Sequence, residues 1–167
     1  LKTGRVSFND TSNNEMGRFD SDGLKFNGDS AAANALSDYE EGTHTMTQVG
    51  SGGGLSLTNN LIRYTKIGNL VHVSGMIDPT VVSGSSNIEL SMPFTSVADS
   101  GNMKTRSTGA LMYKFLNLAG NEKDAVAYIG QNENYMRIYM VQDNGDWGGL
   151  ITSDLSTSSE VFFTITY

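Results

Sequence analysis

The chain has 167 residues, with 11 lysines and arginines against 18 aspartates and glutamates, a formal net charge of -7 and no cysteine. This balance argues against binding to nucleic acid or to anionic membranes, which depends on Lys and Arg, and it excludes disulfides and thiolate metal sites. No apolar stretch approaches the roughly 20 residues that a membrane-spanning helix needs, so we expect no membrane insertion.

Residues 1–42 are expected to form a short extended segment, a shaft or linker ahead of the main domain. In this segment Val6 and Phe8, and then Leu24 and Phe26, alternate with polar residues, as in half-buried strands. Such short pieces are too little material to bury a core alone. We therefore expect the following domain or other copies of the chain to cover them.

Residues 43–167 are expected to form an all-β head domain. Glycine (19 residues) exceeds its usual share of about 7%, and Ser, Thr and Asn are abundant, as in proteins with many tight turns. The only plausible helical turn is AAANALSD at 31–38, because alanine favours helix. The spacing fits a sandwich or a barrel, and we predict a jelly-roll-like antiparallel β-sandwich. The predicted strands cover 43–49, 61–67, 70–77, 87–92, 107–118, 124–130, 134–142, 147–152 and 160–167.

The stretch LIRYTKIGNLVHVSG at 61–75 predicts a β-hairpin with a two-residue turn at Gly68 and Asn69. This turn fixes the register and pairs Thr65 with His72 on a polar face, which is expected to meet solvent or a neighbouring subunit. The other face is expected to enter the core, so the hairpin is scaffold. The residues of this core-facing side are Ile62, Tyr64, Val71, Val73 and Ile77.

Two later strands also alternate. In the last strand, one face is strongly apolar and is expected to lock into a sheet; it carries Val161, Phe163, Ile165 and Tyr167. In the strand at 134–142 both faces are apolar or aromatic. One face, with Met136, Ile138 and Met140, should be core. The other needs a partner or a ligand; it carries Tyr135, Arg137, Tyr139 and Val141.

Signals for catalysis are weak. The densest acidic cluster, Asp38, Glu40 and Glu41, suits a solvated or capping role better than catalysis. The two histidines, His44 and His72, lie far apart in sequence, and neither G-x-S-x-G nor H-E-x-x-H is present. We expect no enzyme activity and no catalytic residues.

Signals for metal binding are weak as well. DSDG at 20–23 and DNGD at 143–146 have the acidic character of calcium loops, but neither continues as an EF-hand loop. Asp-Gly and Asn-Gly are also ordinary turn formers, and we interpret both stretches as turns. No cofactor and no metal site is expected.

Four segments together resemble a recurrent module of tailed-bacteriophage structural proteins: LSDYEEGTHTMTQVG, RYTKIGNLVHVSGMI, SMPFTS and EVFFTITY. In that family the corresponding text is a D-D-Y-E-E-G-T-W-T-P opening, a G-R-Y-T-K-I-G-N-x-V hairpin, an L-P-F-T step and a terminal aromatic strand. The resemblance covers most of residues 20–167. It implies the C-terminal receptor-binding domain of a tail fibre or tailspike, a trimeric β-sandwich that contacts the host surface. The chain departs from the family at His44 and Met46, where Trp and Pro are usual.

Aromatic residues are the best candidates for a ligand site, because a ring face suits the C–H surface of a sugar and neighbouring polar groups can hydrogen-bond its hydroxyls. Trp147 is the only tryptophan and follows an acidic turn. The predicted ligand-binding set is Trp147, Tyr135, Arg137, Tyr139, Asp143 and Asp146. Packing in the core or between subunits is the alternative role for these residues. The loop at 95–106 is a second possible contact region.

The expected function is host attachment by non-catalytic binding to a cell-surface glycan. Weak contacts would be multiplied by avidity across a homotrimer on the tail fibre of the virion, outside the host cell. The expected partners are the host glycan and other virion tail proteins. The first alternative is a structural virion protein, such as a capsid decoration, neck or tail-cap protein. The second alternative is a glycan depolymerase.

Overall fold

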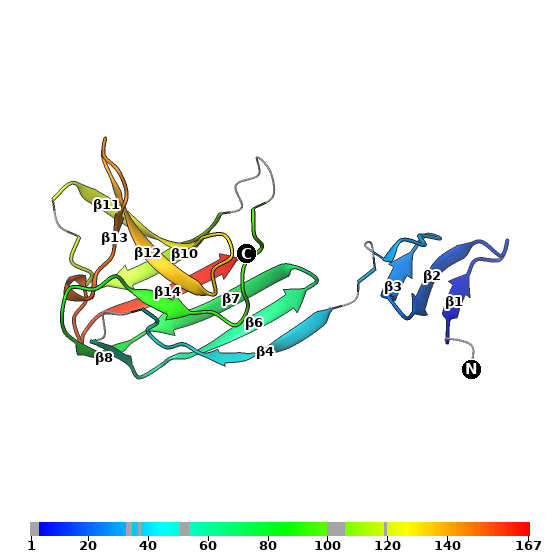
Figure 1. Cartoon of the computed structure of the whole chain (residues 1–167), viewed down its shortest axis with the longest axis horizontal. Helices are drawn as coiled ribbons and strands as arrows, with labels where there is room; N and C mark the ends of the chain where they lie inside the picture. Colours follow the sequence, from blue (N-terminus) through cyan, green and yellow to red (C-terminus); the bar gives the residue numbers. More distant parts are fainter. Residues whose placement is uncertain (1–3, 33–34, 37, 51–53, 100–105, 119) are drawn as a thin grey trace. The chain divides into compact units, whose positions relative to one another are not determined.

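The computed structural model describes residues 4–32, 35–36, 38–50, 54–99, 106–118 and 120–167. Apart from short 3-10 turns, the regular elements in these residues are β-strands (Figure 1), which confirms the predicted all-β class. The chain divides into two compact units. The first contains the described residues up to Glu40 together with Lys66–Asn69, and the second contains those of Glu41–Thr65 and Leu70–Tyr167.

Three strands of the first unit form an antiparallel sheet in the order β1-β2-β3. Their bounds are β1 (Val6–Asn9), β2 (Glu15–Asp20) and β3 (Gly23–Phe26). The register places Val6 opposite Phe19, and Phe8 and Phe26 on either side of Gly17, so these side chains share one face. Four large side chains of this face are more than half exposed: Val6 58%, Phe8 56%, Phe19 51% and Phe26 61%.

The opposite face of this sheet carries charges that are better buried than the apolar residues. The Arg18 and Lys25 side chains are only 8% and 1% exposed. Arg18 Nε donates to Asp20 Oδ2 at 2.8 Å, and Lys25 Nζ donates to the same oxygen at 3.1 Å and to Asp22 Oδ2 at 2.5 Å. The bond from Arg18 is the main cause that lowers the pKa of Asp20 to about 2. The sheet thus reverses the usual arrangement, with its charges covered and its apolar side chains exposed.

Most of the second unit is a nine-stranded antiparallel sheet in the order β13-β12-β11-β10-β14-β7-β6-β4, with β9 also paired to β12. The last strand, β14, lies in the middle of the sheet between β7 and β10 (Figure 1). The bounds are β4 (Tyr39–Thr45), β6 (Leu61–Ile67), β7 (Leu70–Ile77), β9 (Glu89–Ser91), β10 (Ser107–Lys114), β11 (Glu122–Ile129), β12 (Tyr135–Gln142), β13 (Gly148–Gly149) and β14 (Glu160–Thr166).

The chain just after β4 connects the two ends of this sheet. Gln48 pairs with Leu90 of β9, and the Val49 amide donates to the Glu89 carbonyl at 2.8 Å. Because β9 is paired with β12 while β4 is paired with β6, the sheet nearly closes on itself into a barrel. The result is a β-sandwich-like fold, as predicted, with its apolar side chains enclosed between the opposing strands.

The predicted alternation along the main strands is confirmed. Ile62 of β6 and Val73 of β7 are 1% and 0% exposed, and the buried side chains of β12 and β14 fall at the positions expected. They are Met136, Ile138 and Met140 on β12, and Val161, Phe163 and Ile165 on β14. At the hairpin turn Gly68 adopts a positive φ of 59° whereas Asn69 does not, which is the pattern of a type II′ turn.

Some elements differ from the expectation or lie partly outside the described residues. Strands β5 (Leu55–Leu57) and β8 (Pro79–Val82) form a two-stranded sheet that was not predicted. The expected helical turn at 31–38 falls partly outside the described residues, within which Leu36 pairs with Leu24 in an antiparallel bridge. No helix in the described part of the chain has the length and apolar character needed to cross a membrane.

Candidate functional site

The outer face of β11 and β12 carries the side chains that point away from the core. In β11, Ala125, Ala127 and Ile129 point inward and are at most 3% exposed. The residues between them therefore point outward, since side chains alternate along a strand. Val126 lies opposite Tyr139 of β12, and Tyr139 lies opposite Gly149 of β13.

An apolar hollow of about 270 Å³ lies over this outer face. The Tyr139 ring meets the Tyr128 ring edge-to-face, with centroids 5.0 Å apart, and the Trp147 ring at 6.4 Å. Trp147 is 72% exposed, so most of its indole is open to solvent. The hollow therefore offers ring surfaces with little polar lining, which suits an apolar or C–H-rich ligand surface. The lining residues are Thr108, Val126, Tyr128, Tyr139, Val141 and Trp147.

The remaining two residues predicted on β12, Tyr135 and Arg137, belong to a separate closed network. Arg137 Nη1 donates to both carboxylate oxygens of Glu133, at 2.9 and 3.0 Å, and its Nε donates to Glu89 Oε1 at 3.0 Å. Its Nη2 donates to Tyr135 Oη at 2.5 Å, and its guanidinium carbon lies 4.5 Å from the centroid of the Tyr135 ring. Burial lowers the pKa of Arg137, but the bonds to Glu133 and Glu89 outweigh it and raise the pKa overall. This network fixes β9 and the turn before β12 and leaves Arg137 little capacity for a ligand.

The acidic residues of the predicted set lie on the turn between β12 and β13. Asp143 and Asp146 are exposed, and Asn144 between them adopts a positive φ of 56°, as turn residues do. The Asp143 amide donates to the Asn121 carbonyl at 3.2 Å, which ties this turn to the start of β11. The interpretation of DNGD as a turn is confirmed. Of the six predicted residues, the structure brings Tyr139 and Trp147 together in one hollow.

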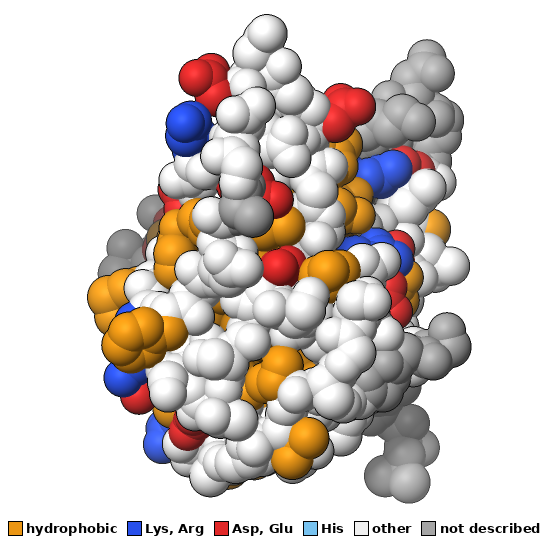
Figure 2. Space-filling model, turned by 90° about the vertical axis from the view of Figure 1, so that its left-hand side faces the viewer, with side chains coloured by type: hydrophobic (Ala, Val, Ile, Leu, Met, Phe, Trp, Pro, Cys, Tyr) orange, Lys and Arg blue, Asp and Glu red, His pale blue; other side chains and the backbone are white. Residues whose placement is uncertain are grey.

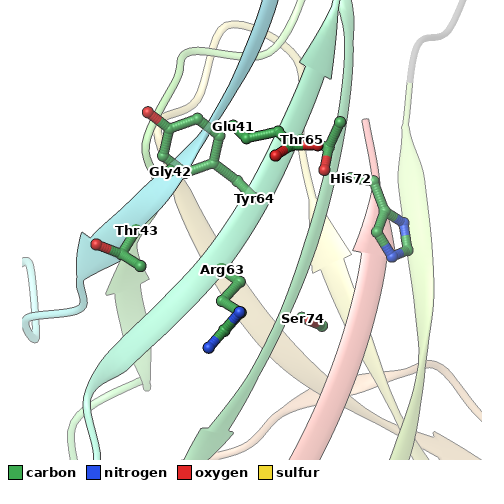
Figure 3. Close-up of a pocket in the computed structure, with 8 residues that line it drawn as sticks. All are labelled: Glu41, Gly42, Thr43, Arg63, Tyr64, Thr65, His72 and Ser74. Atoms are coloured by element: carbon green, nitrogen blue, oxygen red, sulfur yellow. The ribbon is translucent and has the colours of Figure 1, made fainter.

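A second, more polar hollow of about 420 Å³ lies on the outer face of β4, β6 and β7 (Figure 3). It occupies the polar face predicted for the 61–75 hairpin. His72 is held at its side by two threonines of β14, with Nδ1 2.9 Å from Thr166 Oγ1 and Nε2 3.4 Å from Thr164 Oγ1. The side chains that give this hollow its polar character are Glu41, Thr43, Arg63, Thr65, His72 and Ser74.

Other surface features are less site-like. Figure 2 shows that hydrophobic side chains on the face in view form separate groups among polar ones, not one continuous patch. Within the described ranges, no group of three or more His, Cys, Asp or Glu side chains is placed to hold a metal ion.

The predicted ligand-binding set left out Val126 and Tyr128, which line the apolar hollow. It also left out Val141, although the sequence placed Val141 on the strand face that needs a partner or a ligand. The signal for the first two was present, because EKDAVAYI at 122–129 places Val126 and Tyr128 on one face and the alanines on the other. Placing Val126 and Tyr128 beside Tyr139 also requires knowing that β11 pairs with β12, and the alternation within one strand does not reveal which strand is its neighbour.

Comparison of the chain with protein-family models, with curated proteins and with solved structures found no match. The features of the molecule that bear on its function are therefore the two hollows and the exposed faces of the sheets.

Proposed function

We propose that this chain is the receptor-binding end of a bacteriophage tail fibre or tailspike, which attaches to a host cell-surface glycan by non-catalytic binding. The observation that carries the proposal is the exposed Trp147 beside an apolar hollow that also contains Tyr128 and Tyr139. A tryptophan exposed to 72% loses much of the benefit of burial, so a binding role accounts for its position better than a packing role.

The chemistry of the hollow fits a saccharide. Two edge-to-face ring contacts hold Tyr139 between Tyr128 and Trp147, so the aromatic surface is preorganised before a ligand arrives. The exposed Asp143 and Asp146 lie just before Trp147 in the sequence and can accept hydrogen bonds from sugar hydroxyls. Each such contact is weak, and a homotrimer multiplies it through avidity.

The sheet of the first unit supports the homotrimer. Its apolar face, with Val6, Phe8, Phe19 and Phe26, is exposed, and a contiguous exposed apolar face marks a site of interaction with another protein surface. The face carries no charge in its two apolar rows. The same face on other copies of the chain can therefore cover it around a shared axis without burying an unpaired charge.

Whole-cell adsorption by the purified protein tests the glycan proposal. Trp147→Ala is expected to reduce adsorption strongly while leaving assembly unchanged. Phe115→Ala is the matched control, because Phe115 is an exposed aromatic, at 68%, that does not line the hollow. Unchanged adsorption by Trp147→Ala, with assembly intact, would rule out the assignment. Release of reducing sugar from host polysaccharide would instead favour a depolymerase.

One observation favours the structural alternative, in which the chain contacts other virion proteins. Phe162 of β14 lies between Met76 of β7 and Met112 of β10 on the outer face of the sheet, and Met112 is 67% exposed. This apolar row suits a protein partner better than a sugar. Retention on purified heads or tails, without adsorption to cells, would support that role.

A further inference from the structure

Arg63 differs from every other arginine that the structure describes. Arg5, Arg18, Arg106 and Arg137 each form an ion pair with at least one carboxylate. Arg63 is exposed and forms neither an ion pair nor a hydrogen bond with any described residue. Although the chain has 18 acidic residues, none of those in the described ranges forms an ion pair with the Arg63 guanidinium.

Arg63 lines the polar hollow of about 420 Å³. Its guanidinium is therefore available to a ligand that enters the hollow. The hairpin turn places Arg63 opposite Ser74 on the neighbouring strand, and both residues line the hollow. Figure 3 draws Arg63 near Ser74, with Glu41 and Thr65 toward the other end of the hollow. The cation and the carboxylate of the hollow are therefore separated along it.

We propose that this hollow binds the carboxylate of an acidic sugar unit, such as a uronic or sialic acid residue, in the host glycan. This inference rests on the proposed glycan-binding function and adds that the glycan carries a negative charge. The planar guanidinium of Arg63 can donate two parallel hydrogen bonds to a carboxylate. The Ser74 and Thr43 hydroxyls, which can donate or accept, would meet the ring hydroxyls of the sugar.

The two other ionisable groups of the hollow define how a ligand lies in it. The ring nitrogens of His72 are already directed at Thr164 and Thr166, so His72 is a wall of the hollow and Arg63 is its cationic contact. Glu41 repels a carboxylate and accepts hydrogen bonds from hydroxyls. An acidic sugar is therefore expected to bind with its carboxylate toward Arg63 and its hydroxyls toward Glu41.

The test is a titration of the assembled, isotope-labelled protein with sodium glucuronate and, separately, with methyl glucoside, followed by amide chemical shifts. Glucuronate is expected to shift the amides around Arg63, Thr65 and Ser74 in a saturable way that weakens with salt. Arg63→Gln is expected to weaken this binding roughly tenfold or more, since it removes a charge-assisted bond. Arg63→Lys keeps the charge but not the planar fork, and an intermediate loss is expected.

Lys123→Gln is the matched control, because Lys123 is also exposed and without an ion pair among the described residues. Glucuronate binding that survives Lys123→Gln and fails in Arg63→Gln supports the proposal. No saturable shift, an equal response to methyl glucoside, or an equal loss in both variants would overturn it. Trp147→Ala separates the two hypotheses: its effect on cell adsorption tests the proposed function, whereas its glucuronate titration reports on the Arg63 hollow alone.

Discussion

Ile62 of β6 occupies the space that a side chain at Gly75 of β7 would need. A Cβ built on Gly75 would overlap Cγ2 of Ile62 and lie 3.0 Å from its Cβ. Ile62 is 1% exposed and belongs to the core, so it has little room to move away.

We therefore expect Gly75→Ala to destabilise the protein, by about 1–3 kcal/mol, the usual cost of overpacking a core. Urea denaturation followed by far-ultraviolet circular dichroism measures the change. Gly148→Ala is the control, because a Cβ there meets its nearest atoms, in Gln142 and Met140, at 4.0 Å. Equal midpoints for the two variants would show that the Ile62 contact relaxes without cost.

Acid is expected to loosen the sheet of β1, β2 and β3 through Asp20. The folded pKa of Asp20 is lowered from 3.8 to about 2, first by its bond to Arg18. A depressed carboxyl pKa contributes stability that is present above pH 3.8 and is lost as the pH falls through about 2. Amide hydrogen exchange of this sheet should therefore accelerate over that range.

Asp20→Asn provides the comparison for this acid transition. The variant should exchange faster than the unmodified chain at neutral pH, because Arg18 and Lys25 lose a charged acceptor. The difference should disappear once Asp20 is protonated in the unmodified chain. A difference that persists at the acid end would mean that Asp20 acts through its shape and not through its charge.

Alkali is expected to act on the second unit through Tyr167. Burial raises the pKa of Tyr167 to about 12, although its backbone hydrogen bond at Phe94 lowers it. The neutral phenol is therefore favoured by folding, so its contribution is complete below pH 10 and is lost as the pH rises through about 12. Unfolding curves collected at increasing pH measure the loss.

Tyr167→Phe isolates this effect from the other tyrosines. Tyr167 Oη donates to the Phe94 carbonyl at 3.2 Å and accepts from the Phe94 amide at 3.3 Å. The phenylalanine variant should be less stable at neutral pH by about 1 kcal/mol, the typical net value of a hydrogen bond. It should also lose less stability than the unmodified chain between pH 10 and 12. Parallel curves would assign the alkaline transition to other groups.

Assembly is expected to depend on the apolar face of the first unit. A charge in place of Phe26, which is 61% exposed, would be buried without a partner if three copies share this face. Phe26→Asp should therefore convert a sedimenting trimer into single chains, whereas Thr11→Asp, on the exposed turn between β1 and β2, should not. An unmodified chain that already sediments alone would remove the trimer from the proposal.

The main strands could be predicted because alternation along them is regular. The bounds of β6 and β7 agree with the prediction, since the turn at Gly68 and a strict period of two leave one register available. Strands β5 and β8 were missed because three or four residues are too few to show a period, and Pro79 argues against a strand.

The candidate site could be predicted only in part. A single tryptophan after an acidic turn was a usable signal, and Tyr139 follows from the alternation of β12. The ion pairing of Arg137 could not be predicted, because its partner Glu89 lies 48 residues away and contacts it only through the pairing of β9 with β12. Equally, the sequence shows that the first strands alternate but not that their charged side is the covered one.

The central position of β14 has a consequence for biosynthesis. A nascent chain emerging from the ribosome presents β7 and β10 long before the strand that separates them in the sheet. Until β14 arrives, both strands expose edges that can pair with those of other nascent chains. Temperature and chaperone supply should therefore change the expression yield more than they change the stability of the folded protein. Substitutions in β14 should cause inclusion bodies even where the folded protein keeps its stability.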